Sequence, residues 1–226
     1  YKVAVVMPEN VSVERVQLLE AYGAEIIPSD GSRGTNGSIE VAQDLVNKRG
    51  SDYHMLYQYG NSGNPNAHYE TTGPEIVEAL PDISMFVAGL GTGGTLMGVA
   101  RCLKEHNPES KIVAVAPEPD DFISGLRSLE EGFIPPILDI GLLDSRMLVN
   151  SFDAFSTAKR LLAEEGIFAG VSSGSAVYGA IRQAERIDEG DIVCLLADGG
   201  WKYLSTALWT KDYEQLAKDA KGKIWW

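Results

Sequence analysis

The chain alternates short apolar runs with longer amphipathic segments, and this alternation limits the folds that it can adopt. The longer segments repeat apolar residues at helical spacing, whereas the short runs contain few polar residues. Strands that alternate with helices form mainly parallel sheets covered by helices on both faces. The sequence therefore predicts a three-layer α/β architecture, in which ligands bind beyond the carboxyl ends of the strands.

The same pattern predicts where the elements begin and end. The predicted strands are short apolar runs at residues 3–7, 24–27, 54–57, 83–88, 112–116 and 192–196. The predicted helices span residues 12–22, 38–48, 73–80, 96–106, 153–165 and 174–184, with one more from about residue 204 and a last one ending near residue 221. Loops or irregular connections are predicted at 30–37, 60–67 and 133–151. The loop at 60–66 is the best candidate for a domain boundary, which would separate a smaller domain, 1–60, from a larger one, 61–226.

Composition argues against several classes of function. The formal net charge of −13 argues against nucleic-acid binding, which depends on basic side chains that neutralise phosphates. No apolar run approaches the roughly 20 residues that a membrane span needs, and no signal peptide is visible. Cys102 and Cys194 lie in apolar elements without a CxxC pattern, and the three histidines fall in separate segments. We therefore expect buried structural thiols, no metal site and a cytoplasmic protein.

One glycine-rich stretch combines the features of an anion site. The sequence GLGTGGTLMG, residues 89–98, follows the predicted strand 83–88 and leads into the predicted helix 96–106. A strand, a glycine turn and a helix direct backbone N–H groups and the positive end of the helix dipole at one point. The stretch therefore predicts a cradle for an anion.

The identity of the anion is open to two interpretations. The glycines match GxGxxG, and Glu118 follows the next strand, as in a dinucleotide site for NAD. Thr92 and Thr95, however, add two hydroxyl donors, which suit a small phosphate monoester better than a pyrophosphate bridge. A tight turn without any ligand is a further alternative.

Four stretches in order resemble one enzyme family, and this resemblance favours the phosphate monoester. The stretch GTGGT at 91–95 is similar to the phosphate cup of the pyridoxal-phosphate enzymes related to cysteine synthase and tryptophan synthase β, which share fold type II. The other three stretches are QYGN with NP and TGPE at 58–75, EGIFAGVSSG at 165–174 and DGGWKYLST at 198–206. The resemblance implies pyridoxal 5′-phosphate as the cofactor.

The resemblance implies a role for each residue of the cofactor site. The cofactor phosphate would lie against Gly91, Thr92, Gly93, Gly94 and Thr95. The Ser172 hydroxyl would bond the pyridine nitrogen, which a neutral group leaves unprotonated, so that the ring is a moderate electron sink suited to β-replacement. Asp198 would lie near the same nitrogen. The alternatives are that Ser172 only caps a helix and that Asp198 is an ordinary turn residue.

The substrate side is also implied by the resemblance. Gln58 corresponds to a glutamine near the substrate carboxylate, and Gly125 to a backbone contact in the segment that closes over the substrate. The loop around Arg127 resembles that of a cysteine synthase subgroup that uses O-phosphoserine, where an arginine pairs with the substrate phosphate. The alternative is that Arg127 pairs with Glu130 or Glu131 on a surface turn.

The same subgroup implies partners. Its sulfur donor resembles a small carrier protein with a C-terminal thiocarboxylate, and its own C-terminal tail can cover the site. Residues 222–226, GKIWW, are a candidate for such a tail, and ordinary packing or disorder is the alternative. Family members are usually homodimers, so we expect a homodimer that binds a small amino-acid substrate.

One part of the family pattern is not found in this sequence. The family's Schiff-base lysine lies in a motif resembling SxKDR, followed by a TSGNTG-like loop, and neither occurs here. The chain begins at Tyr1 and enters a strand at once, which predicts an N-terminally truncated enzyme that is inactive alone. The alternatives for its function are a cystathionine β-synthase or dehydratase type of lyase and a non-catalytic binding module.

Overall fold

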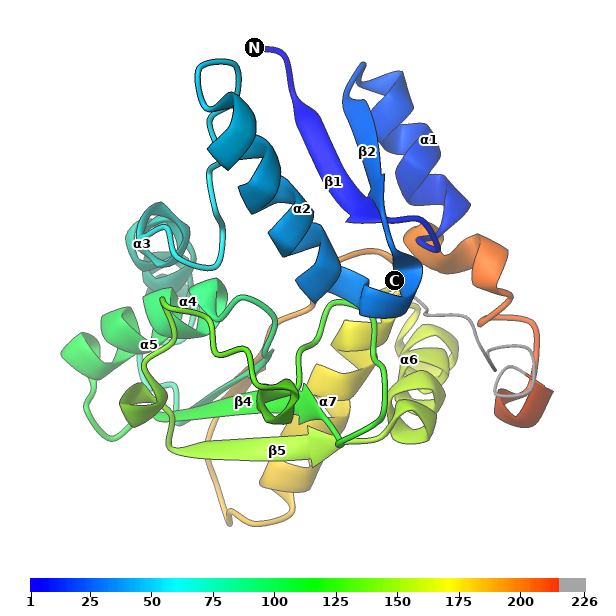
Figure 1. Ribbon diagram of the computed structural model, residues 1–226. Helices are drawn as coiled ribbons and strands as arrows, with labels where there is room; N and C mark the ends of the chain where they lie inside the picture. Colours follow the sequence, from blue (N-terminus) through cyan, green and yellow to red (C-terminus); the bar gives the residue numbers. More distant parts are fainter. Residues whose placement is uncertain (216–226) are drawn as a thin grey trace. The chain divides into compact units, whose positions relative to one another are not determined.

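Two separate parallel sheets are present in residues 1–215, which are the residues that the computed structural model describes, the side chain of Glu131 excepted. The contacts divide the chain into two units (Figure 1). The first unit combines residues 1–56 with the chain from residue 200 onward, and the second is residues 57–199. The predicted division into domains at residues 60 and 61 stays a prediction.

The second unit contains a four-stranded sheet in the order β5-β4-β3-β6. Its strands are β3 (Met85–Gly89), β4 (Lys111–Pro117), β5 (Ser145–Val149) and β6 (Ile192–Cys194). Every neighbouring pair is parallel. The carboxyl ends of all four strands therefore meet at one edge, where the connecting loops leave the sheet.

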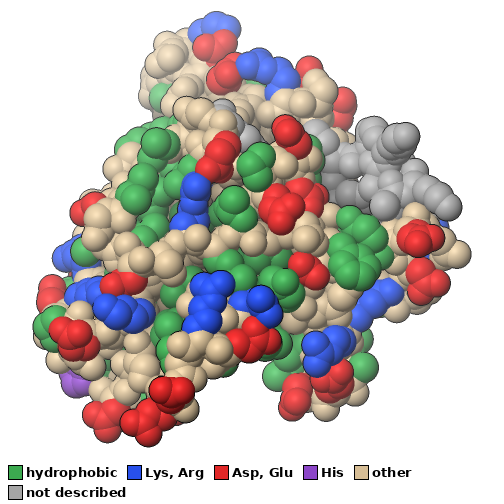
Figure 2. Space-filling model, turned by 90° about the horizontal axis from the view of Figure 1, so that it is seen from below, with side chains coloured by type: hydrophobic (Ala, Val, Ile, Leu, Met, Phe, Trp, Pro, Cys, Tyr) green, Lys and Arg blue, Asp and Glu red, His purple; other side chains and the backbone are tan. Residues whose placement is uncertain are grey.

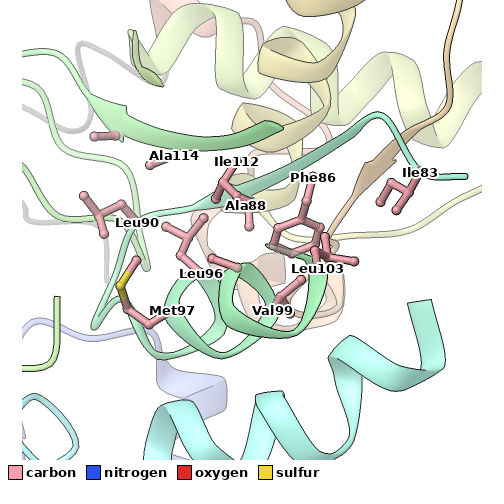
Figure 3. Close-up of a cluster of buried hydrophobic side chains, with 12 residues drawn as sticks. Ile83, Phe86, Ala88, Leu90, Leu96, Met97, Val99, Leu103, Ile112 and Ala114 are labelled. Carbon is pink, nitrogen blue, oxygen red and sulfur yellow. The ribbon is translucent and has the colours of Figure 1, made fainter. Parts of the chain in front are cut away.

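Helices cover both faces of this sheet. Phe86 and Ala88 point toward α5 (Gly94–His106), whereas Val87 between them approaches Gly179 of α7 (Val171–Ala184) on the other face. This alternation is the pleat of a strand that is buried on both sides. Figure 3 shows how the α5 side closes around β3 and β4, through Ile83, Phe86, Ala88, Leu90, Leu96, Met97, Val99, Leu103, Ile112 and Ala114.

Three further helices complete the second unit. α6 (Ser151–Glu165) packs along α7, while α3 (Gly63–Glu70) and α4 (Thr72–Ala79) pack on α5 (Figure 1). Asn150 caps α6 by accepting the N–H of Asp153 at 2.9 Å, and Gly166 ends that helix in the left-handed conformation, at φ 70°. The predicted three-layer α/β architecture is confirmed in this unit.

The first unit contains a smaller sheet of two parallel strands, β1 (Ala4–Pro8) and β2 (Glu25–Ser29), joined by α1 (Val13–Ala21). α2 (Gly34–Arg49) packs on β1. The 3-10 turn at Gly200–Thr206 is tied to the start of α1, because Glu14 accepts the Ser205 N–H at 2.6 Å and its hydroxyl at 2.7 Å. These bonds hold two segments together that lie far apart in the sequence.

The strand expected at 54–57 is wrong. Among the described residues, no strand is paired with this run, Leu56 is 72% exposed, and Tyr57 has a φ of 43°. An apolar run becomes a strand only where a neighbouring backbone accepts its hydrogen bonds. The strands predicted at 3–7, 24–27, 83–88, 112–116 and 192–196 are confirmed, and each observed end lies within two residues of the predicted one.

Two of the predicted loops are partly helical. α2 begins at Gly34, directly after a 3-10 turn at Gly31–Arg33 that Asp30 caps by accepting the Ser32 N–H at 2.8 Å. Burial of Gly34 and Gly37 outweighs the low helix propensity of these glycines. α3 begins at Gly63, whose N–H is accepted by Asn61 at 2.8 Å. Pro65 lies in the first turn, where a proline costs no intrahelical hydrogen bond.

The remaining corrections concern the C-terminal half. β5, within the predicted irregular segment 133–151, is an edge strand with several exposed side chains, so it lacks the apolar pattern of a central strand. The helix expected from residue 204 is instead the end of a 3-10 turn, with a kink at Tyr203. The predicted helix that ends near residue 221 lies partly outside the described residues. The candidate tail 222–226 lies wholly outside them.

The surface carries charges of both signs. On the face drawn in Figure 2, Lys and Arg side chains are interspersed with Asp and Glu, without a continuous basic stripe. Within residues 1–215, no helix has the length and apolarity to cross a membrane, and no cluster of His, Cys, Asp and Glu is arranged to hold a metal ion.

Candidate active site

A cavity of about 150 Å³ lies at the carboxyl edge of the four-stranded sheet. All of its lining residues belong to the second unit. They come from the loop after β3, the segment near residue 125, the first turn of α7 and the chain after β6. The lining residues are Gly89, Gly91, Thr92, Gly93, Gly94, Thr95, Gly125, Leu126, Ser172, Leu195 and Ala197.

The glycines of the loop have steric reasons to be glycine. Gly93 has a φ of 88°, in the left-handed region, immediately before α5. A Cβ at Gly91 would lie 2.8 Å from the carbonyl oxygen of Gly125, and one at Gly94 would collide with the Asn64 side chain. The backbone therefore lines the cavity directly, at the end of α5 where unpaired N–H groups attract an anion.

Thr92 is held so that its hydroxyl proton is available to a ligand. Its Oγ1 accepts the Asn64 Nδ2–H at 3.0 Å and the Gly94 N–H at 3.2 Å. A hydroxyl oxygen accepts two hydrogen bonds and donates one, so the proton is what remains. The Asn64 amide also donates to the carbonyl of Gln58 at 2.8 Å, which fixes which end of the amide faces Thr92.

The Thr95 hydroxyl is bonded by His68, which lies on α3 together with Asn64. Its Oγ1 lies 3.2 Å from Nε2 of His68, and Nδ1 of His68 lies 2.9 Å from the hydroxyl of Thr72. Burial lowers the pKa of His68, which favours the neutral ring. Asn64 and His68 are four residues apart and so share one face of α3.

Sequence reasoning did not include Asn64 and His68 in the site. The signal that could have found them is the pair Gly94 and Gly98 on α5, small residues that allow another helix to come close. A Cβ at Gly98 would collide with the carbonyl of Pro65 and lie 2.6 Å from Cβ of His68. The approach of α3 to α5 at this point brings the imidazole to Thr95.

Ser172 lies in the cavity wall, in the first turn of α7. The N-cap of that helix is Gly170, two residues earlier, so the alternative that Ser172 is the cap is wrong. Gly125 adopts a φ of 85°, and a Cβ there would come within 3.6 Å of Oγ of Ser172. The carbonyl of Asp198 accepts the Gly170 N–H at 2.9 Å, which brings Asp198 beside the start of α7.

Arg127 is buried, with 6% of its surface exposed. Its guanidinium carbon lies 5.1 Å from the ring centre of Tyr59 and 4.8 Å from that of Phe133. Its backbone N–H donates to the carbonyl of Leu90 at 2.7 Å, which ties it to the glycine loop. This burial contradicts the surface position that the alternative requires, and Glu130 pairs with Arg146 at 2.6 Å. A pair with Glu131 is not tested, because that side chain lies outside the described part of the chain.

The comparisons with known proteins agree with this geometry. The family model described as pyridoxal-phosphate dependent enzyme matches residues 1–198. The chain therefore belongs to the family of pyridoxal-phosphate-dependent enzymes, and pyridoxal 5′-phosphate is the cofactor. The dinucleotide alternative is excluded by this membership.

Within the family, the chain is similar to cysteine synthases. Cysteine synthase A of Escherichia coli (strain K12) is 39% identical over 226 residues, which cover 92% of this chain and 70% of that protein. A probable cysteine synthase of Bacillus subtilis (strain 168) is 40% identical, with 93% and 71% covered. The crystal structure of cysteine synthase from Entamoeba histolytica superposes with a TM-score of 0.85 at 32% identity, over 99% of this chain and 69% of that one.

A second group of solved structures is also similar. The crystal structure of O-ureido-L-serine synthase superposes with a TM-score of 0.84 at 34% identity, over 96% of this chain and 73% of that one. Fold type II is therefore the fold of this chain, as the resemblance predicts.

The cavity fits the phosphate end of the cofactor. It offers the N-terminus of α5 and two hydroxyls, and at Thr92 the two hydrogen bonds that the oxygen already accepts leave its proton available. A dianionic phosphate needs several donors around one group of oxygens. Among residues 57–199, the lysines Lys104, Lys111 and Lys159 are not in the cavity wall.

Proposed function

We propose that this chain belongs to an enzyme that makes L-cysteine by β-replacement, from O-phosphoserine or O-acetylserine and a sulfur donor. The observation that carries the proposal is the cavity at the end of β3, where Thr92 and Thr95 flank the start of α5. Its support is the similarity to cysteine synthases at about 40% identity.

The cofactor residues have distinct roles in this proposal. When bound, pyridoxal phosphate supplies an electron sink for charge that develops at Cα of an amino acid. Residues 91–95 hold its phosphate, and the Ser172 hydroxyl bonds its pyridine nitrogen without protonating it. Asp198 lies beside the start of the helix that carries Ser172 and contributes to that end of the site.

Arg127 is the proposed selector of O-phosphoserine. A guanidinium pairs with a phosphate through two parallel hydrogen bonds, and the rings of Tyr59 and Phe133 hold its plane. The bond from its backbone to Leu90 keeps it at a fixed distance from the phosphate loop. Gln58 and the backbone of Gly125 are the proposed contacts for the amino-acid part of the substrate.

The partners follow from the same proposal. A thiocarboxylated sulfur-carrier protein is the proposed donor, because the loop around Arg127 resembles that of the enzymes that use one. The proposed assembly is a cytoplasmic homodimer. The tail 222–226, which lies outside the described residues, is the proposed cover of the site.

We also propose that residues 1–226 do not turn over substrate by themselves. Proton movement at Cα in this family needs the lysine that carries the cofactor. No lysine of the second unit lines the cavity, and none in the whole sequence lies in the family's motif.

Substrate choice is tested by replacing the guanidinium. In the protein expressed from its full reading frame, Arg127→Lys should lower kcat/KM for O-phosphoserine by about 100-fold, since a lost bidentate charged pair costs about 2–3 kcal/mol. The value for O-acetylserine should change by less than about threefold. Arg160→Lys, at an exposed helix pair, is the control. An equal loss for both substrates would contradict the selector role.

The role of the lysine is tested without any turnover. A polypeptide of residues 1–226 is incubated with pyridoxal phosphate, reduced with borohydride, and digested for peptide mass analysis. We expect no site-specific adduct. A single stoichiometric adduct, for example on Lys202, would show that these residues provide their own base.

A further inference from the structure

His68 joins two hydroxyl groups that come from different helices. Its ring lies on α3, Thr95 is in the first turn of α5, and Thr72 is the first residue of α4. The distances are 3.2 Å from Nε2 to the Thr95 oxygen and 2.9 Å from Nδ1 to the Thr72 oxygen. Both ring nitrogens are therefore bonded to a hydroxyl.

The tautomer of the ring decides whether Thr95 can donate to a ligand. A neutral imidazole has one N–H donor and one acceptor nitrogen, and a threonine hydroxyl has a single proton. If Nε2 is the acceptor, Thr95 donates its hydroxyl proton to the ring and cannot donate it to a ligand in the cavity. If Nε2 carries the proton, it donates to Thr95, and the Thr95 proton can point at an anion.

We propose that His68 is a positioning residue for the cofactor phosphate: its Nε2–H donates to Thr95, so that the Thr95 hydroxyl proton points into the cavity. Thr72 completes the chain by donating its own proton to Nδ1. The inference rests on the proposed function, because it takes residues 91–95 as the phosphate site.

The hydrogen bonds of Thr92 are a parallel that supports this tautomer of His68. There, two N–H donors already occupy the hydroxyl oxygen, one of them from Asn64 on the same face of α3. With His68 in the proposed tautomer, α3 supplies one N–H donor to each threonine of the loop. Both hydroxyl protons are then available to the same anion.

The packing fixes the ring where this role needs it. Gly98 is one turn after Thr95 on α5, and the absence of a side chain there lets α3 approach to its backbone. His68 is partly buried, which favours the neutral ring that the proposal requires.

Two substitutions of His68 distinguish the loss of its hydrogen bond to Thr95 from the loss of its packing. A glutamine amide reaches about as far as Nε2 and still donates, whereas an asparagine amide reaches only as far as Nδ1. In the full-reading-frame protein, His68→Asn should weaken pyridoxal phosphate binding by about fivefold, the worth of one ordinary hydrogen bond. His68→Gln should remain within about twofold of the parent. His106→Asn and His106→Gln are the controls, because His106 is exposed and its Nε2 bonds a loop carbonyl, that of Pro81.

The same variants have a spectroscopic readout. The ³¹P resonance of bound pyridoxal phosphate should shift in His68→Asn and stay in place in both His106 variants. Thr72→Val should shift it less, with Thr71→Val as its control, since Thr71 bonds the Ala67 carbonyl on an exposed turn.

The tautomer is measured directly by ¹⁵N resonances of the histidine rings. With pyridoxal phosphate bound, Nε2 of His68 should have the shift of a protonated nitrogen, and Nδ1 that of an unprotonated one. The opposite pattern would overturn the proposal, as would an equal binding loss in His68→Asn and His68→Gln.

Thr95→Val separates this proposal from the one on which it rests. If that variant leaves both the affinity and the ³¹P resonance unchanged, residues 91–95 are not the phosphate site, and the proposed function fails. If Thr95→Val weakens binding while His68→Asn does not, the phosphate site stands and only the role of His68 is refuted.

Discussion

The two sheets of this chain are both parallel, but they differ in how completely they are buried. In β3 and β4, Phe86, Val87 and Val113 are almost inaccessible. In β1 and β2, most side chains remain partly exposed, and the buried residues are Met7, Pro8 and Ser29. Two strands alone give little independent stability, whereas a sheet of four with helices on both faces makes a core.

The difference explains where the candidate site lies. The residues that line the cavity end or follow a strand of the buried sheet, or lie in the first turn of a helix packed on it. A site that holds a phosphate by several hydrogen bonds needs its donors fixed within a fraction of an ångström. The buried sheet supplies this rigidity, and substitutions in the two sheets and at the helix contact measure how strongly the site depends on it.

The largest contrast should come from truncating one side chain in each sheet. Phe86→Ala should lower the free energy of unfolding of the second unit by about 3–5 kcal/mol, because a fully buried ring leaves a cavity. Ile26→Ala in β2, which is partly exposed, should cost the first unit about 1 kcal/mol. Hydrogen exchange read separately for residues 57–199 and 1–56 measures both. Similar losses in the two units would mean that the sheets do not differ in this way.

A smaller effect is expected where α3 meets α5. Gly98→Ala should destabilise the second unit by about 1–3 kcal/mol, because the new methyl group meets backbone atoms that cannot rotate away. It should also weaken pyridoxal phosphate binding, since α3 would carry Asn64 and His68 away from the loop.

The control for this substitution is Gly166→Ala. Gly166, unlike Gly98, has a positive φ, of 70°, and a Cβ there meets nothing within 4 Å. The cost should be about 1 kcal/mol of strain with unchanged cofactor affinity. If Gly98→Ala binds the cofactor as tightly as Gly166→Ala, then the position of α3 does not control the phosphate loop.

The smallest contrast is electrostatic. Burial alone would raise the pKa of Asp144, but hydrogen bonds from Lys104 and the Ile112 N–H outweigh it, so the pKa is lowered. A carboxylate with a lowered pKa stabilises the folded state above its ordinary pKa of 3.8, and this contribution is lost as the pH falls below that value.

Two substitutions make this contrast measurable. Asp144→Asn should cost about 1–2 kcal/mol at pH 7 and progressively less toward pH 3. Asp52→Asn, which removes an exposed partner of Arg49 in the first unit, should have no measurable effect at either pH. Chemical denaturation at several pH values measures both. A pH-independent cost for Asp144→Asn would assign its role to packing alone.

The sequence could predict the buried sheet and the glycine loop because both have local signals. Strands that are apolar on both faces, such as β3 and β4, form unbroken apolar runs, and the loop carries its own glycines and threonines. The order of the strands along the chain also predicts that their carboxyl ends meet. The amino-acid sequence is therefore sufficient to locate the candidate site.

The errors arose where side-chain contacts, local or distant, decide the structure. The start of α3 contains Gly63, Asn64 and Pro65, which predict a loop until the Asn61 side chain is seen to hold the first turn. Edge strand β5 has an irregular pattern, since several of its side chains are exposed. His68 became part of the site only through the approach at Gly98, which joins segments about thirty residues apart.

The central claim is that the loop at residues 91–95 holds the phosphate of pyridoxal phosphate through hydroxyl protons that α3 directs into the cavity. Its most direct test is the ³¹P spectrum and affinity of pyridoxal phosphate bound to the Thr92→Val variant, because the donor role of Thr92 follows from the bonds to its oxygen. A shifted resonance and an affinity lower by about tenfold, with Thr71→Val unchanged, is the predicted result. An unchanged resonance and affinity would contradict the account.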